Sequence, residues 1–285
     1  MSSTSMPRPI TALVKPRRHI SLGWIMLDLN VVLTFLFLYA PIIVLIVFSF
    51  NDSRQQQVWV GFTLDWYQQM LQDDRILEAA KNSIVIATIS TIVSTIIGTM
   101  TALALDRYRF RLKTTVEGAL YLPIIVPEIV MAISLLVFFN QVFRWLDDLV
   151  GLTLKFGLGT ITIAHIAFSF PFVAVVVRAR LADFDRTLEQ AAQDLGANEW
   201  QVLRHITLPL LMPGIIAGAL LAFTLSIDDF VITFFNAGIG ATTLPLEIYG
   251  RIRRTITPEV NAISAVLLLA SITLVLGSLL LQRRR

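Results

Sequence analysis

The sequence predicts an all-α membrane protein with six transmembrane helices. Hydrophobic residues make up 55% of its 285 residues and charged residues only 15%, whereas soluble domains carry about 25% charged residues. Mean hydropathy is +0.72, and the charges are collected in short segments between long apolar runs. A helix needs about 20 apolar residues to cross the hydrocarbon core, so each long run is a candidate span.

Six runs meet that requirement. The predicted spans are Leu29–Phe50, Ser83–Leu105, Gly118–Phe139, Gly159–Val177, Leu210–Phe234 and Ala262–Leu281. They define a six-helix membrane domain over residues 29–281, with terminal segments at 1–28 and 282–285. Between the spans, residues 73–80 are expected to form a short helix that leads into the second span. Residues 141–155 are expected to form a short interfacial helix.

The distribution of lysine and arginine predicts the orientation. The segments at both termini, after the second span and after the fourth span hold 15 of the 23 basic residues. Because basic residues concentrate in short cytoplasmic loops, this set is expected to be cytoplasmic, with both termini inside. An even number of spans agrees with that orientation.

Several kinds of chemistry are not expected in this chain. It has no cysteine, so disulfides, thiolate metal sites and cysteine nucleophiles are excluded. Its three histidines, His19, His165 and His205, are too scattered to suggest a metal site. No glycine-rich phosphate loop is present, so the chain is not expected to hydrolyse ATP. We therefore predict no catalytic residues, no bound metal and no enzyme activity.

A polar segment stands between the fourth and fifth spans. It lies within residues 179–209, and its spacing predicts a helix, a turn and a second helix. Asp185 or Thr187 can cap the first helix, and Gly196 supplies the backbone freedom for the turn. Pro209 is expected to end the second helix. The apolar faces of the two helices are formed by Ala191, Ala192 and Leu195, then by Trp200, Leu203 and Ile206.

This segment resembles the EAA signature of ABC importer permeases. The matching residues are Glu189, Ala191, Ala192, Gly196, Ile206, Leu208 and Pro209. The resemblance implies a type I ABC importer permease fold. It also implies that the segment contains a coupling helix, which docks into a groove on an ATPase subunit. Under that reading ATP is bound by the partner ATPase subunits, and this chain itself holds no cofactor.

Shorter stretches along the chain narrow the resemblance to spermidine/putrescine importer permeases, and most closely to the second permease of such a pair. They are SFNDS, FTLDWY, RYRFR, PEIVMAISLL, FTLSIDDFVI, ATTLP and TPEVNA. The family implies a heterodimer with a second permease, two ATPase subunits and an extracytoplasmic substrate-binding protein. It implies a location in the bacterial inner membrane among lipids, with no nucleic-acid partner.

Acidic residues within predicted spans are functional candidates, because a charge in the bilayer is costly. Glu128 lies near the middle of the third span, next to Pro123 and Pro127, which remove backbone donors and can break the helix. Asp228 and Asp229 lie in the fifth span. Adjacent helical residues point about 100° apart, so at most one aspartate is expected to face a central path squarely. Carboxylates along a path can compensate the protonated amines of a polyamine. Ser226 offers a neutral acceptor and Trp66 a cation–π face. His165 is interpreted as a hydrogen-bonded packing residue.

Other functions remain open from the sequence. The same importer architecture can carry another amine, an opine-like compound or an iron complex. A proton-coupled secondary transporter or a channel can use Glu128 and the two aspartates, but its inverted repeats are not visible. A membrane enzyme would need a nucleophile or a group of metal-ligating residues, and neither is visible in the sequence.

Overall fold

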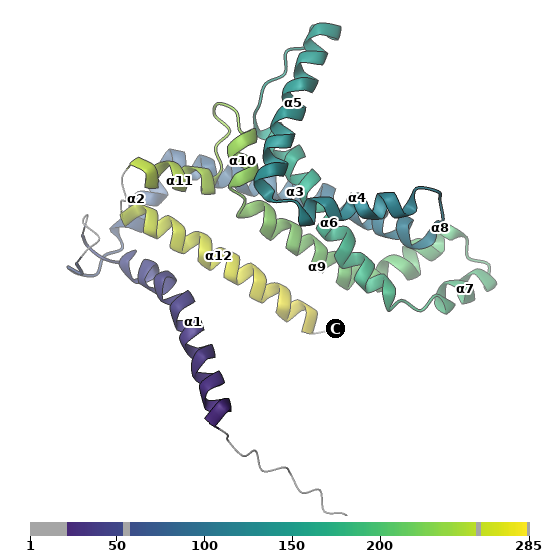
Figure 1. The fold of residues 1–285 in the computed structure, drawn as a ribbon, viewed down its shortest axis with the longest axis horizontal. Helices are drawn as coiled ribbons and strands as arrows, with labels where there is room; N and C mark the ends of the chain where they lie inside the picture. Colours follow the sequence, from purple (N-terminus) through teal and green to yellow (C-terminus); the bar gives the residue numbers. More distant parts are fainter. Residues whose placement is uncertain (1–21, 54–57, 255–257, 284–285) are drawn as a thin grey trace, which may run out of the picture. The chain divides into compact units, whose positions relative to one another are not determined.

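The computed structural model describes residues 22–53, 58–254 and 258–283, and every named element in them is a helix (Figure 1). The elements are α1 (Leu22–Phe48), α2 (Asp65–Gln72), α3 (Asp74–Arg107), α4 (Lys113–Ile125), α5 (Glu128–Val150), α6 (Leu158–Ala182), α7 (Thr187–Asp194), α8 (Glu199–Val202), the π-helical turn η1 (Leu203–Thr207), α9 (Leu208–Ile227), α10 (Val231–Asn236), α11 (Leu244–Arg254) and α12 (Pro258–Arg283). Across the described residues, β pairing is limited to an isolated bridge between Asn51 and Phe62. The all-α prediction is confirmed.

Five described helices are long and apolar enough to cross a membrane. They are Ile25–Phe48, Asp74–Arg107, Glu128–Val150, Leu158–Ala182 and Glu199–Ile227, and Pro258–Thr273 is a shorter apolar helix. The set agrees with the predicted six-helix membrane fold. Several predicted boundaries are nevertheless wrong, for reasons that follow below.

The chain divides into two units, residues 1–47 and residues 48–285. In the first unit the described element is α1, which has 27 residues and is about 40 Å long at 1.5 Å per residue. Its apolar side chains are exposed along the helix, as Phe37 shows with 80% of its surface accessible. A helix that is apolar on all sides is suited to contact with lipid.

The centre of the second unit is formed by α3, α6 and α9. Val173 of α6 lies between two glycines, Gly98 of α3 and Gly218 of α9. A Cβ atom at Gly98 would lie 2.7 Å from the Val173 Cβ, and one at Gly218 would lie 3.0 Å from its Cγ1. Small residues allow close helix packing in membranes, where the hydrophobic effect between helices is weak. The buried residues of this cluster are Ala102, Val173, Val177, Leu181, Leu211 and Ala222.

The two ends of this helix core carry different structures. Within the second unit, α7 and α8 lie at one end of α6 and α9, and α10 and α11 lie at the other (Figure 1). We refer to these as the α7–α8 end and the α10–α11 end. The helix α9 joins them, since it follows η1 directly and ends just before α10.

The third predicted span, 118–139, is wrong because it runs across a helix break. The helix α4 ends at Ile125, and α5 begins at Glu128 after an extended Val126 and Pro127. Pro127 has no backbone N–H to donate to the preceding turn, so the α-helical hydrogen bonds are interrupted there. The fifth predicted span, 210–234, likewise crosses a break at residues 228–230, between α9 and α10.

Two predicted short helices are also corrected. Residues 141–155 do not form a separate interfacial helix, because α5 continues to Val150 and ends at Gly151, which has φ +67°. Residues 73–80 are not a separate helix either, since they open the 34-residue α3. Asp73 caps α3 by accepting hydrogen bonds from the backbone N–H groups of Arg75 and Ile76. The short helix in this region is α2, which comes before Asp73.

Candidate functional site

The polar segment forms the predicted helix, turn and second helix. Asp185 accepts a 2.9 Å hydrogen bond from the Thr187 backbone N–H, and Gly196 turns the chain with φ +89°. This backbone bond from Thr187 lowers the pKa of Asp185. Asn198 and Gln201 then form a reciprocal capping box, in which each side chain accepts from the other's backbone N–H at 2.8–2.9 Å.

The predicted end of the second helix at Pro209 is wrong. The chain passes from α8 through η1 into α9, and Pro209 is the second residue of α9. The Leu208 backbone N–H donates to the Leu203 carbonyl, five residues back. In a regular α-helix the proline ring would collide with the carbonyl four residues earlier. The wider π turn accommodates Pro209, so the helix continues into the membrane-length segment.

Glu189 is bonded within the chain. Its Oε1 atom accepts hydrogen bonds from the Arg107 guanidinium and from the Thr207 hydroxyl, and Arg107 Nη2 also lies 3.1 Å from Thr207 Oγ1. These residues come from α7, α3 and η1. One turn away, Arg186 donates a 2.6 Å hydrogen bond to the Asp106 carboxylate. The α7–α8 segment is thus tied to the end of α3 by two ion pairs.

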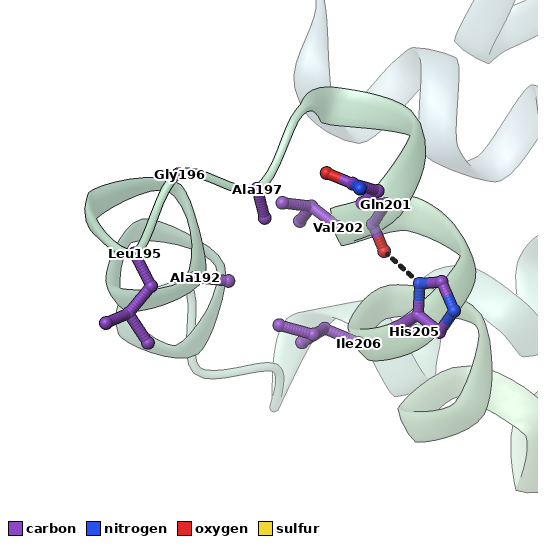
Figure 2. A pocket seen from close by; sticks show the side chains of 8 residues that line it. All are labelled: Ala192, Leu195, Gly196, Ala197, Gln201, Val202, His205 and Ile206. Carbon is purple, nitrogen blue, oxygen red and sulfur yellow. Dashed lines mark hydrogen bonds between the residues drawn. The ribbon is translucent and has the colours of Figure 1, made fainter.

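An open groove of about 400 Å³ lies between α7 and α8 (Figure 2). It is lined by Ala192, Leu195, Gly196, Ala197, Gln201, Val202, His205 and Ile206. Leu195 is 90% exposed and Trp200 is 65% exposed. Large apolar side chains exposed beside a groove are typical of a protein interaction surface. Three predicted coupling residues, Ala192, Gly196 and Ile206, line the groove.

The other predicted coupling residues lie elsewhere. Ala191 is exposed on α7, while Leu208 and Pro209 stand in the first turn of α9. Glu189 faces α3 and η1. The EAA pattern therefore gathers two kinds of residue, those that line the groove and those that hold the helix pair in place.

A second site lies at the break between α9 and α10. Asp229 is buried there, and its carboxylate accepts hydrogen bonds from the backbone N–H groups of Ile232 at 3.3 Å and Thr233 at 2.8 Å. The Thr233 hydroxyl adds a 3.0 Å bond. The carboxylate thereby satisfies backbone donors that the first turn of α10 leaves without helical partners.

His165 of α6 connects both sides of this break. Its Nδ1 atom lies 2.7 Å from the Ser226 hydroxyl, and its Nε2 atom lies 3.1 Å from Asp229 Oδ1. The Ser226 hydroxyl is 3.0 Å from that of Ser90 in α3. This buried network extends from α3 to α10, and His165 has the hydrogen-bonded interior position that its sequence context indicates. An imidazole has one donor and one acceptor nitrogen in its neutral form, so it can bond on both sides.

The remaining acidic candidates are less enclosed. Glu128 is the first residue of α5, where the α4–α5 break brings its half-buried carboxyl group beside that of Asp229. Asp228 is exposed and accepts a 3.2 Å hydrogen bond from the Ser271 hydroxyl of α12. Adjacent residues 228 and 229 thus have different surroundings, one toward α12 and one in the interior.

Trp66 does not lie at either helix break. It belongs to α2, is only 7% exposed, and donates its indole N–H to the Asn51 carbonyl at 2.9 Å. The structure brings together Glu128, Asp229 and Ser226, whereas Asp228 and Trp66 have other partners.

A cluster that the sequence analysis missed surrounds Arg251 of α11. Its guanidinium donates to Asp73 at 2.6 Å, Glu247 at 2.9 Å and Glu259 at 3.4 Å. Burial alone would raise the pKa of Asp73, but the Arg251 guanidinium and the backbone donors of Ile76 and Arg75 hold it below the usual value. The spacing of Glu247 and Arg251 is the only part of this cluster with a local sequence signal.

Solved structures with a similar fold come from ABC transporters. A chain of a bacterial ABC transporter involved in the import of the acidic polysaccharide alginate superposes with a TM-score of 0.74. The match is 20% identical and covers 92% of this chain and 95% of that one. A chain of the MetNI methionine ABC transporter matches with a TM-score of 0.57 at 16% identity, over 78% of this chain and 99% of that one. This chain therefore shares the fold of those ABC transporter chains.

Sequence comparison then gives the family. Residues 94–284 match the model of the binding-protein-dependent transport system inner membrane component, and the chain belongs to this family. It is 46% identical over 247 residues to the spermidine/putrescine transport system permease protein PotC of Escherichia coli K12, covering 87% of this chain and 90% of that protein. It is 41% identical to the putrescine transport system permease protein PotI of the same strain, covering 83% of each. The chain is thus a multi-pass inner membrane permease subunit.

Proposed function

We propose that this chain is a permease subunit of an ATP-driven polyamine importer and that it forms the translocation path with a second permease. The observation that carries the proposal is the identity of 41–46%, over more than four fifths of the chain, to permeases named for spermidine or putrescine. The site chemistry supports it. Polyamines carry several protonated amines, and carboxyl groups at two helix breaks can compensate those charges when water is removed.

Within that path we assign two roles to the acidic residues. Glu128 and Asp228, which keep part of their surface accessible, contact the passing ammonium groups. Asp229 and Ser226 are buried and stabilise the break between α9 and α10 without contacting the cargo. The cation–π contact predicted for Trp66 requires that its ring face be uncovered during transport, because the side chain is 7% exposed.

Energy is proposed to arrive through the α7–α8 groove, from two ATPase subunits that bind the ATP. The exposed Leu195 and Trp200 support this assignment, since they offer apolar surface for a partner beside a preformed groove. In this arrangement the α7–α8 end and both termini are cytoplasmic, and an extracytoplasmic substrate-binding protein delivers its cargo at the α10–α11 end.

Orientation can be tested directly because the chain has no cysteine. Single cysteines at Leu195 and at Ile239, which are 90% and fully exposed, provide one reporter at each end. In intact cells, a membrane-impermeant maleimide is expected to label position 239 and to spare position 195. The reverse labelling pattern would contradict the proposed orientation.

Transport is tested with the complex reconstituted in liposomes together with its second permease, ATPase subunits and binding protein. ATP-dependent uptake of labelled spermidine or putrescine is the expected result. Uptake driven by a proton gradient without ATP would support a secondary transporter instead. If another cationic or small solute is taken up and polyamines neither enter nor compete, the importer class stands and the polyamine assignment falls.

A further inference from the structure

The helix α3 connects the two ends of the second unit. Its 34 residues form one helix about 50 Å long at 1.5 Å per residue. At its start, the capping residue Asp73 is paired with Arg251 at 2.6 Å. At its end, the last two residues, Asp106 and Arg107, are both paired with the α7 region. Movement of α7 is therefore mechanically connected to a helix that reaches the α10–α11 end.

The joint at Arg107 contains three elements. The Arg107 guanidinium of α3 bonds the Glu189 carboxylate of α7 and the Thr207 hydroxyl of η1, and the Thr207 hydroxyl also donates to Glu189. Each of the three side chains contacts the other two. A closed set of this kind fixes the positions of its elements more firmly than one ion pair does, because no member can leave without breaking two contacts.

The neighbouring ion pair, Arg186–Asp106, fixes the register of the α7 region against α3. Asp106 precedes Arg107 on α3, and Arg186 lies three residues before Glu189. Arg186 and Asp106 pair at 2.6 Å. The order of charges is acid then base on α3 and base then acid beside it, so a change of register would bring like charges together.

Burial shows which way Glu189 faces. The Glu189 side chain is 14% exposed and that of Arg107 is 31% exposed. Its Oε1 atom already accepts two hydrogen bonds within the chain. This carboxylate therefore holds α7 to its own subunit, while the groove residues face outward toward a partner.

We propose that Arg107, Glu189 and Thr207 form the joint through which movement of the α7–α8 pair is passed to α3. Arg107 and Glu189 are positioning residues for energy coupling. The inference rests on the proposed function, since it needs an ATPase that moves the α7–α8 pair. Breaking the joint leaves the groove in place, so ATPase binding and hydrolysis continue. Less of the movement of the α7–α8 pair is then passed to α3 and the other membrane helices.

The first experiment neutralises one partner at a time. Glu189→Gln and Arg107→Gln are placed in the complete reconstituted complex, and ATP hydrolysis and spermidine uptake are measured in the same liposomes. We expect the ATPase subunits to copurify and uptake per ATP hydrolysed to fall about tenfold, which corresponds to loss of one charge-assisted hydrogen bond. A purely structural defect would lower assembly and both rates together.

The matched control is the Arg178–Glu117 pair, which joins α6 to α4 at 2.9 Å with both side chains 28% exposed. Glu117→Gln removes the carboxylate of another partly exposed ion pair, one that does not touch α7. Its uptake per ATP is expected to equal that of the unmodified complex. A ratio that falls equally in Glu117→Gln and Glu189→Gln would overturn the proposal.

The decisive experiment exchanges the charges. In the double variant Arg107→Glu with Glu189→Arg, the Thr207 hydroxyl can still donate to the acid and accept from the base, because a hydroxyl does both. We expect the double variant to recover at least half of the original uptake per ATP, although each single reversal loses it. If Glu189 instead serves a partner subunit directly, the exchange cannot restore coupling, and that result overturns the joint. Absence of spermidine uptake by the unmodified complex would contradict the proposed function instead.

Discussion

The two ends of α9 are held by the same type of side-chain group. Each end has a carboxylate that accepts hydrogen bonds from a threonine hydroxyl and a basic side chain at an interruption of the regular α-helix. The members are Glu189, Thr207 and Arg107 at the π turn, and Asp229, Thr233 and His165 at the α9–α10 break. In both cases the basic residue comes from another helix, so each set fastens α9 to its neighbours.

The difference between the two sets is their access to solvent. At the π turn the ion-paired side chains are 31% and 14% exposed, whereas His165 and Asp229 are 2% and 1% exposed. Solvent partly screens the first pair, so each of its contacts costs less to break than a buried one. A buried polar group that loses its partner has no water to replace it. The partly exposed set is suited to a joint that moves together with the elements it connects, and the buried set is suited to a break whose geometry must remain fixed.

The largest expected effect comes from the α7–α8 end. Gly196→Asp places a side chain at φ +89°, where L-residues are strained, and adds a charge beside the apolar groove. We expect transport to be abolished because the ATPase subunits lose their docking surface. Copurification of those subunits and substrate-stimulated ATP hydrolysis are the measurements.

Gly240→Asp is the control for this variant. Gly240 has φ +81°, and, as at Gly196, nothing lies within 4 Å of the position that a Cβ atom would take, but Gly240 lies at the α10–α11 end. The control is expected to keep the ATPase subunits attached. If Gly196→Asp also retains them, together with stimulated hydrolysis, the docking role of the α7–α8 pair is wrong.

The next effect concerns the acidic break. Asp228→Asn together with Asp229→Asn should lower polyamine uptake at least tenfold while the complex stays assembled, since asparagine keeps the size and an acceptor oxygen but removes the charge.

The single variants separate the two roles. Asp229→Asn is expected to destabilise the complex by about 1–3 kcal/mol, because an amide group faces donors that a carboxylate satisfied. Asp228→Asn should affect uptake with little change in stability. Unchanged uptake kinetics in liposomes for the double variant would refute a path role.

A smaller effect is expected for His165. His165→Leu removes the bonds to Ser226 and Asp229 and should destabilise the complex by about 1 kcal/mol, the scale of a hydrogen bond between membrane helices. His165→Gln keeps a donor that can reach Asp229 and is expected to recover part of that loss. Thermal unfolding in detergent measures both variants. Equal melting temperatures for His165→Leu and the unmodified complex would show that the network does not stabilise the break.

The sequence predicted the fold class and the helix–turn–helix of the polar segment because both depend on local signals. Apolar length predicts spans, and Gly196 predicts a turn. Both spans were drawn across a break because hydropathy is continuous over residues 118–139 and 210–234. The first break had a local signal, since Pro123 and Pro127 can interrupt a helix, and it lies at Pro127. The second had none, and the hydrogen-bond geometry at Asp229 shows where α10 begins.

The site was predicted in its residue types but not in its partners. An acidic residue in a span is conspicuous by itself, so Glu128, Asp228 and Asp229 were found. Nothing in the spacing relates His165 to Asp229, or Arg107 to Glu189, because they are 64 and 82 residues apart in sequence. Pro209 shows the limit of a local rule: proline usually ends a helix, but the π turn before it removes the collision that would do so.

The smallest expected effect lies at the other end of α3, where Asp73 pairs with Arg251. The pKa of Asp73 is lowered in the folded protein from its ordinary value of 3.8. The pair therefore contributes its full stabilisation above that pH and loses it as the pH falls further, through the folded-state pKa. Because Asp73 is 30% exposed, the contribution is about 0.5–1 kcal/mol. Melting temperatures at pH 6 and pH 3.5 should differ less for Asp73→Asn than for the unmodified complex, with Asp74→Asn at the exposed neighbouring position as control. If Asp73→Asn leaves the pH dependence unchanged, this end of α3 is held by packing and not by the ion pair, and α3 has a charge-based joint only at Arg107.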